Sequence, residues 1–227
     1  AYEIRLSLVG SEMCIRDRAI EQAIRDAGMR PVNLGPIPTP ALAAYALGRG
    51  KGSMMITGSH IPFDRNGYKT NSAIGELLKT DEAPIAAFVE RWRAQIYGTP
   101  YADSPFDEHG RFKSGSRPCA PQDPSGGSEY LRRYREFFGT GALRGVLVLV
   151  YQHSAVGRDL LVEMLRELGA VAHPVGRSDI FTPIDTEAID DTTLETIREL
   201  AQQASATGKR YQAVVSTDGD SDRPLLV

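Results

Sequence analysis

The sequence has little cysteine, little net charge and no long apolar run. Its two cysteines, Cys14 and Cys119, lie far apart among 227 residues, which argues against a disulfide framework and favours a reducing compartment. The formal net charge of -3 gives no sign of a nucleic-acid or membrane partner. No apolar run is long enough to span a membrane, and residues 1–5 lack the zones of a signal peptide. We therefore expect a cytoplasmic protein without membrane or nucleic-acid partners.

The spacing of the apolar residues predicts an α/β fold. Helical spacing occurs in residues 18–27, 41–47, 83–96, 128–138, 159–168 and 191–204. Strand-like apolar runs occur in residues 31–34, 53–57, 145–150, 171–175 and 211–215. Strands that are apolar throughout and alternate with helices are typical of a mixed or parallel sheet with helices on its faces.

Composition divides the chain into two predicted domains. Residues 97–127 are rich in Pro, Gly, Ser and Asp, which indicates irregular loops and a domain boundary. We expect α/β domains over 1–127 and 128–227. The first 17 residues do not fit this pattern, so we expect an incomplete or atypical N-terminus. Residues 224–227 are typical of a strand just beginning, which suggests a truncated second domain.

An aspartate-rich loop follows the last apolar strand. Asp218, Asp220 and Asp222 alternate with other residues, so they can turn to one side of an extended loop. Like charges 4 Å apart repel by roughly 4 kcal/mol, so such a cluster needs a cation, and oxygen ligands favour Mg²⁺ or Ca²⁺. Arg223 can supply donors to a bound anion. An EF-hand or a solvated acidic turn is the alternative, although Arg223 stands where an EF-hand has glycine.

A serine-containing loop follows the strand 53–57. A serine at a strand end, in a loop shaped by glycine and proline, is exposed and well positioned for chemistry. A serine hydrolase is an alternative, but neighbouring side chains on an extended chain point apart, so His60 is a poor base for Ser59. Ile61 also stands where the nucleophile-elbow pattern requires glycine. A turn capped by Ser59 and packed by His60 is the structural alternative.

The two loops together resemble those of the α-D-phosphohexomutases, which include phosphomannomutase, phosphoglucomutase and phosphoglucosamine mutase. The family's serine loop reads Thr-Ala-Ser-His-Asn-Pro, then Asn-Gly and a lysine; residues 57–62 read Thr-Gly-Ser-His-Ile-Pro and residues 66–69 read Asn-Gly-Tyr-Lys. The family's metal loop, Asp-Gly-Asp-x-Asp-Arg, is matched in full by residues 218–223. Residues 35–42 look like the turn ahead of the family's serine strand. Gly58 and Ile61 depart from the family pattern.

The resemblance implies roles for these residues and an architecture for the chain. The implied metal ligands are Ser59, Asp218, Asp220 and Asp222. The implied catalytic residues are Ser59 as the phosphoryl carrier, His60 lining the centre, Lys69 in proton transfer and Arg223 holding phosphate. The implied fold is the first two of the four phosphohexomutase domains.

The resemblance also implies an activity that interconverts hexose 1-phosphate and hexose 6-phosphate. A phosphoserine, Mg²⁺, a bisphosphorylated sugar intermediate and hexose 1,6-bisphosphate as activator would belong to it. Residues 151–159 and 181–189 look like the second domain of some phosphomannomutases, which favours mannose phosphate; residues 151–159 are otherwise a plain cap and turn. Phosphoglucomutase, phosphoglucosamine mutase, a metal-dependent sugar phosphatase and a non-catalytic sugar-phosphate-binding protein are the alternatives. The sugar-reading parts of the family lie in its third and fourth domains, so we expect this chain alone to be inactive.

Overall fold

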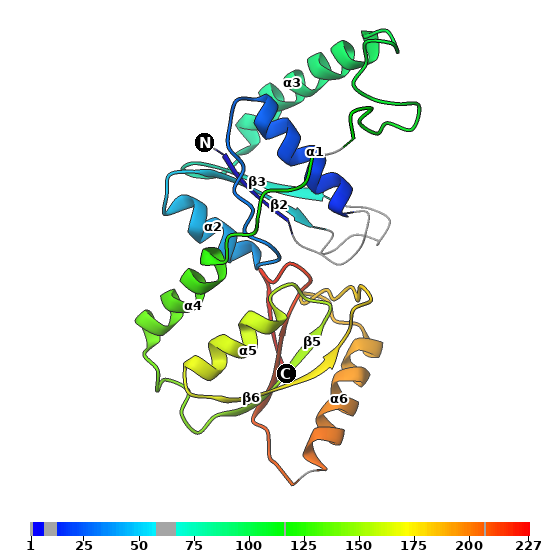
Figure 1. Ribbon diagram of the computed structural model, residues 1–227. Coiled ribbons are helices and arrows are strands. Elements are labelled where there is room, and N and C mark those ends of the chain that lie inside the picture. Colours follow the sequence, from blue (N-terminus) through cyan, green and yellow to red (C-terminus); the bar gives the residue numbers. More distant parts are fainter. Residues whose placement is uncertain (1, 7–12, 58–66, 116, 207) are drawn as a thin grey trace.

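The computed structural model describes residues 2–6, 13–57, 67–115, 117–206 and 208–227, with the backbone alone for 2–6 and 13–16 (Figure 1). The strands in these ranges are β1 Tyr2–Leu6, β2 Gly52–Thr57, β3 Gly67–Ser72, β4 Gly75–Glu76, β5 Leu147–His153, β6 Val171–Arg177, β7 Ala213–Thr217 and β8 Pro224–Leu226. The helices are α1 Met13–Asp26, α2 Thr39–Leu47, α3 Lys79–Gly98, α4 Ser125–Phe138, α5 Arg158–Glu167 and α6 Asp191–Ser205.

The strands form two four-stranded sheets, which confirms the predicted α/β fold with two sheets. The first has the order β1-β2-β3-β4, with β1 parallel to β2 and the other pairs antiparallel. The second has the order β6-β5-β7-β8, with three parallel strands and an antiparallel β8 at its edge. We call the first sheet with α1–α3 the first unit, and the second sheet with α5 and α6 the second unit.

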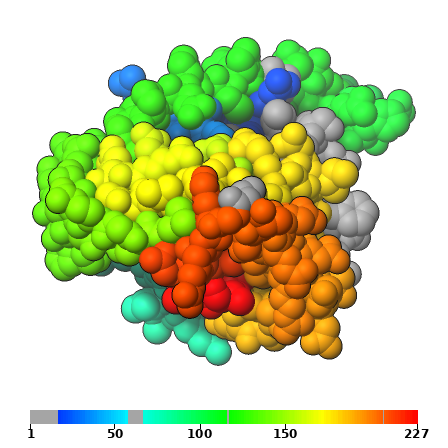
Figure 2. All heavy atoms as spheres, turned by 90° about the horizontal axis from the view of Figure 1, so that it is seen from below, coloured from blue at the N-terminus to red at the C-terminus, as the bar shows by residue number. Residues whose placement is uncertain are grey.

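Helices cover both faces of the second sheet, as the apolar strands predicted. Leu149 and Tyr151 of β5 pack in a cluster that includes Ile197 of α6. Val148 and Val150, which point to the other face, pack with Val162 of α5. β8 completes the α6 side, because Leu225 joins the same cluster as Ile197. Figure 2 shows the red C-terminal residues at the surface beside the orange α6 segment.

The helix α4 joins the two units through a shared core (Figure 1). Leu34, Leu42 and Met55 of the first unit form a buried cluster against which Tyr130 of α4 and Leu160 of α5 pack. The boundary predicted between residues 127 and 128 falls within the first turn of α4. The division into domains at that point stays a prediction.

Several predicted boundaries differ from the structure. The strand predicted at 31–34 is wrong: Asn33 makes only an isolated bridge to Gln122, and Gly35 turns the chain with a φ of 70°. Helix α4 begins at Ser125, three residues before the predicted start at residue 128. Residues 67–72, where no strand was predicted, form β3, which pairs with β2.

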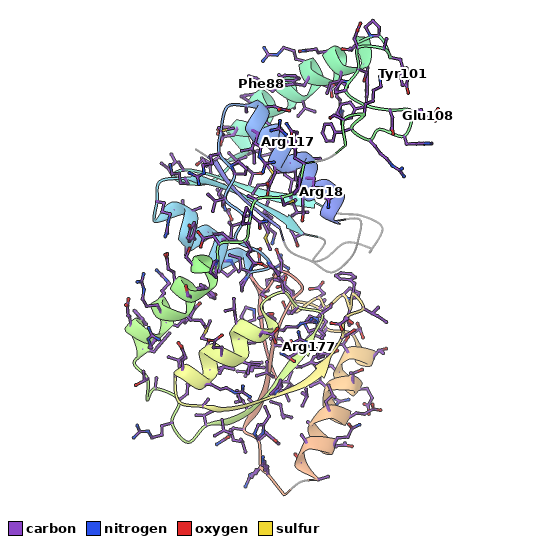
Figure 3. All side chains as sticks on the ribbon, in the orientation of Figure 1. Arg18, Phe88, Tyr101, Glu108, Arg117 and Arg177 are labelled. Atoms are coloured by element: carbon purple, nitrogen blue, oxygen red, sulfur yellow. The ribbon has the colours of Figure 1, made fainter. Side chains whose placement is uncertain are left out.

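Helix α3 lies at the end of the first unit farthest from the second sheet (Figure 3). It contains Pro84 and has no buried residue, although the apolar spacing of residues 83–96 correctly predicted a helix. Phe88, labelled in Figure 3, and Trp92 are more than half exposed.

Candidate metal centre

Three aspartates converge in the loop between β7 and β8. This loop leaves the carboxyl end of a parallel strand, the edge at which α/β sheets usually bind ligands. Asp218, Asp220 and Asp222 each offer a carboxylate oxygen, and the three oxygens lie within 4.8 Å of one another. Asp218 and Asp220 are fully buried, and the Asp222 side chain is 27% exposed. The structure thus brings together three of the four predicted metal ligands.

The loop is folded around the Asp218 carboxylate. Asp218 Oδ1 accepts hydrogen bonds from the backbone N–H groups of Asp222 and Arg223, at 3.1 Å each. The Asp218 N–H donates in turn to the Arg223 carbonyl at 3.0 Å. Ser221 adopts a φ of 61°, so the chain turns sharply between the last two aspartates. These bonds pair backbone groups of the loop and orient the Asp218 carboxylate.

The turn after β5 supports the loop from within the second unit. The Gly157 N–H donates to Ser221 Oγ at 2.9 Å, and the Val156 N–H donates to the Gly219 carbonyl at 2.9 Å. Beside this turn, Arg177 at the end of β6 pairs with Asp159 at 2.6 Å (Figure 3). The segment 151–159, a cap and turn by one interpretation of the sequence, therefore contacts the aspartate loop directly.

His153 lies behind the loop and is fully buried. Its Nε2 lies 2.8 Å from the Thr217 carbonyl, to which it donates as the neutral imidazole. Burial lowers the pKa of His153, and the hydrogen bond to Thr217 opposes this only in part. The imidazole is therefore held neutral at the base of the loop.

Thr39 of the first unit holds the middle aspartate. As the first residue of α2, it donates from its N–H to the Asp220 carbonyl at 2.9 Å and from Oγ1 to Asp220 Oδ2 at 2.8 Å. The positive end of the helix dipole also favours a carboxylate here. Sequence reasoning missed this residue, although a threonine at a helix start is a known capping signal.

Lys69 of the first unit reaches the same cluster from β3. Its Nζ lies 2.7 Å from Asp220 Oδ2 and 2.5 Å from Asp222 Oδ2. Burial alone would lower the pKa of Lys69, but the hydrogen bonds and charges of Asp220 and Asp222 outweigh it, so the pKa is raised. The lysine is thus held as an ammonium ion, which supplies a positive charge to two of the three clustered carboxylates.

The other predicted site residues are placed differently. The Arg223 guanidinium is 40% exposed and lies 3.3 Å from Glu187 Oε2, so in this structure it pairs with a carboxylate. Ser59 and His60 lie outside the described residues.

The donor set fits a hard divalent cation. Mg²⁺ takes oxygen ligands and needs few protein carboxylates when phosphate and water complete its shell. Three clustered carboxylates, two of them buried, meet that requirement. A cation there would also offset the repulsion between the carboxylates, as the Lys69 ammonium does in this structure.

Comparison with known proteins supports the resemblance of the two loops. Residues 11–95 match the model for phosphoglucomutase/phosphomannomutase, alpha/beta/alpha domain I. A phosphomannomutase of Sinorhizobium fredii (strain NBRC 101917 / NGR234) is 41% identical over 204 residues, which are 90% of this chain and 39% of that protein. Residues 11–95 thus match the phosphoglucomutase/phosphomannomutase domain I, and the chain is similar to a phosphomannomutase over 90% of its length. The α-D-phosphohexomutase resemblance of the two loops is therefore confirmed.

Further members of the family are also similar to the chain. A phosphomannomutase of Salmonella muenchen is 34% identical over 92% of this chain and 38% of that protein. A phosphoglucosamine mutase of Actinobacillus succinogenes is 30% identical over 93% of this chain and 43% of that protein. The chain thus spans about two fifths of the length of these relatives.

The described part of the chain contains no helix that is both long enough and apolar enough to cross a membrane.

Proposed function

We propose that the chain is the phosphoryl-transfer part of a phosphohexomutase that acts on mannose phosphate. The observation that carries the proposal is the convergence of Asp218, Asp220 and Asp222 with Lys69, since the lysine comes from a different sheet, on the strand that follows the serine loop. The two similar phosphomannomutases support mannose phosphate over the glucose and glucosamine alternatives. The two units would then be the first two domains of the family's four.

In this proposal the phosphoryl carrier is Ser59. A phosphoserine adds about 1.5 to 2 negative charges, so it needs positive groups between it and the aspartates. Mg²⁺ held by Asp218, Asp220 and Asp222, with Ser59 as a further ligand, would neutralise charge on the phosphoryl oxygens. His60 would line the centre.

Lys69 and Arg223 complete the proposed centre. Lys69 lies on the carboxylates and carries its proton there, so it is suited to give a proton to an oxygen of the sugar phosphate. Arg223 would exchange its exposed partner Glu187 for phosphate, because a planar guanidinium binds phosphate with two parallel hydrogen bonds. Phosphoryl transfer depends mainly on such positioning and charge neutralisation.

Labelling of the serine tests the phosphoryl carrier. The chain is incubated with mannose 1,6-bisphosphate and Mg²⁺, and phosphate on Ser59 is located by peptide mass spectrometry. We expect slow labelling of Ser59 and none in Ser59→Ala. Steady release of inorganic phosphate would favour a sugar phosphatase, and sugar-phosphate binding without labelling would favour a binding protein.

A chimera tests the mutase reaction. The chain replaces the matching two fifths of the S. fredii phosphomannomutase, and conversion of mannose 1-phosphate to mannose 6-phosphate is followed. We expect activity that depends on bisphosphate and falls by at least about a thousandfold in Ser59→Ala, since the covalent route is lost. A better kcat/KM with glucose or glucosamine phosphate would reassign the substrate.

A further inference from the structure

Lys69 carries a positive charge from the first unit to the aspartate loop of the second. It leaves the middle of β3, where it is paired with Met55 of β2, so its backbone is fixed by the first sheet. Its ammonium lies between two carboxylates that belong to the second unit. The ammonium thus joins residues that lie 151 positions apart in the sequence.

Lys69 binds carboxylates of the cluster that would hold a cation. Asp220 Oδ2 accepts from both Thr39 and Lys69, and Asp222 Oδ2 accepts from Lys69. The ammonium thus binds two of the three clustered carboxylates. An ammonium and a divalent cation cannot both lie in contact with the same carboxylate oxygens at full strength, because like charges at such distances repel strongly.

We propose that Lys69 is an internal counter-ion which occupies the aspartate cluster in the cation-free protein and must move away when Mg²⁺ binds. The proposal rests on the metal site of the proposed function and deepens it. Loading of the cation then releases Lys69 from Asp220 and Asp222. The lysine is therefore available to substrate only after the cation has bound.

Titration of the whole chain with MgCl2 by isothermal calorimetry tests the displacement. In Lys69→Met the competing charge is gone while the length of the side chain is kept, so we expect Mg²⁺ to bind about tenfold more tightly than in the unaltered chain. Solvent screening of a partly exposed lysine keeps the effect below the full Coulomb value. Lys69→Arg keeps the charge and is expected to bind Mg²⁺ within about threefold of the unaltered chain.

Lys209→Met is the matched control. Lys209 is exposed and precedes the amino end of β7, opposite the aspartate loop. The substitution Lys209→Met removes the same charge from the protein, and we expect it to change the Mg²⁺ affinity by less than about twofold. Equal tightening in Lys209→Met and Lys69→Met would mean that net charge alone acts, and would overturn the proposal.

Thermal unfolding separates displacement from a simple structural brace. In EDTA, Lys69→Met should unfold at a lower temperature than the unaltered chain, because two carboxylates lose their partner. In saturating Mg²⁺ the difference should close or reverse. An equal loss of stability with and without Mg²⁺ would identify a brace and contradict displacement.

Asp220→Asn distinguishes failure of this inference from failure of the metal site. If the unaltered chain binds Mg²⁺, Asp220→Asn does not, and Lys69→Met binds no more tightly than the unaltered chain, the counter-ion role alone is wrong. If the unaltered chain and Lys69→Met both fail to bind Mg²⁺, the metal site and this inference fall together.

Discussion

Asp220 is oriented by residues that stand far from it in the sequence. Thr39 lies 181 residues away and Lys69 lies 151 residues away, yet each donates to the same carboxylate oxygen. Two donors on one buried oxygen fix the direction of the carboxylate. The proposed metal site therefore depends on groups of the first unit as much as on the loop itself.

Removal of the Thr39 hydroxyl should weaken the site. Thr39→Val keeps the shape of the side chain but takes a donor from a buried carboxylate; hydrogen bonds to charged groups contribute about 1.5–3 kcal/mol. Because Thr39 is half-buried, we expect a loss near 1.5 kcal/mol in the free energy of unfolding in urea, and several-fold weaker Mg²⁺ binding.

Thr39→Ser serves as the control, because it keeps the hydroxyl. It should retain most of the stability and nearly all of the Mg²⁺ affinity. Equal losses in the serine and valine variants would show that the threonine methyl group matters, and not the bond to Asp220.

At this scale the sequence identified the residues of the loop but not those that hold it. The alternation of Asp218, Asp220 and Asp222 is a local pattern, and it was sufficient to predict that their carboxylates converge. The role of Thr39 was beyond local reasoning, because it arises from a contact between separate units. Thr39 lies in residues 35–42, which resemble the turn ahead of the family's serine strand and indicate no contact with the aspartate loop.

At the scale of the elements, the spacing of apolar residues predicted those helices and strands that bury an apolar face. The helices α5 and α6 and the strands β5, β6 and β7 were placed within a few residues, since each buries an apolar face in one of two clusters. The segment 31–34 was wrongly predicted as a strand because pairing is not visible in the segment itself. Asn33 there uses its side chain to accept from the Gly35 N–H and to donate to the Ala120 carbonyl.

His153, at the end of β5, should make the free energy of unfolding depend on pH. The pKa of His153 is lowered in the folded state, so the unfolded chain binds a proton more readily. Stability from this group is complete above the ordinary histidine pKa of about 6.5 and falls as the pH drops through that value toward the lower folded pKa. We expect the free energy of unfolding to decline between pH 7 and pH 5, by at most about 1.4 kcal/mol per pH unit from this residue.

The measurement is a set of urea unfolding curves across that range. His153→Gln cannot take up a proton, so its stability should decline less steeply with falling pH than that of the unaltered chain. His109→Gln is the control, because His109 is exposed in a loop of the first unit, and its slope should match that of the unaltered chain. A slope unchanged by His153→Gln would show that the buried imidazole does not control this dependence.

At the scale of the whole molecule, the two units meet at the aspartate loop. Thr39 and Lys69 approach it from the first unit, and the turn at Gly157 supports it from the second. The same turn touches Pro38, which precedes α2. Close packing at this junction therefore helps to hold the two units together and to orient the carboxylates of the aspartate loop.

An alanine substitution at Gly157 tests whether the two units need this close packing. Its φ is -85°, so alanine meets no backbone strain, but a Cβ there would lie 2.7 Å from Ser221 Oγ and 2.9 Å from Pro38 Cγ. Overpacking of this kind costs about 1–3 kcal/mol. We expect Gly157→Ala to lower the free energy of unfolding by that amount and to weaken Mg²⁺ binding, because the loop must move away from Thr39 and Lys69.

Gly141→Ala is the matched control: its Cβ would lie 3.8 Å from the nearest atom, in Arg144, and its stability should stay within about 1 kcal/mol of the unaltered chain. Equal stability and equal Mg²⁺ affinity in the two alanine variants would mean that the units do not need this close contact to hold the aspartates together.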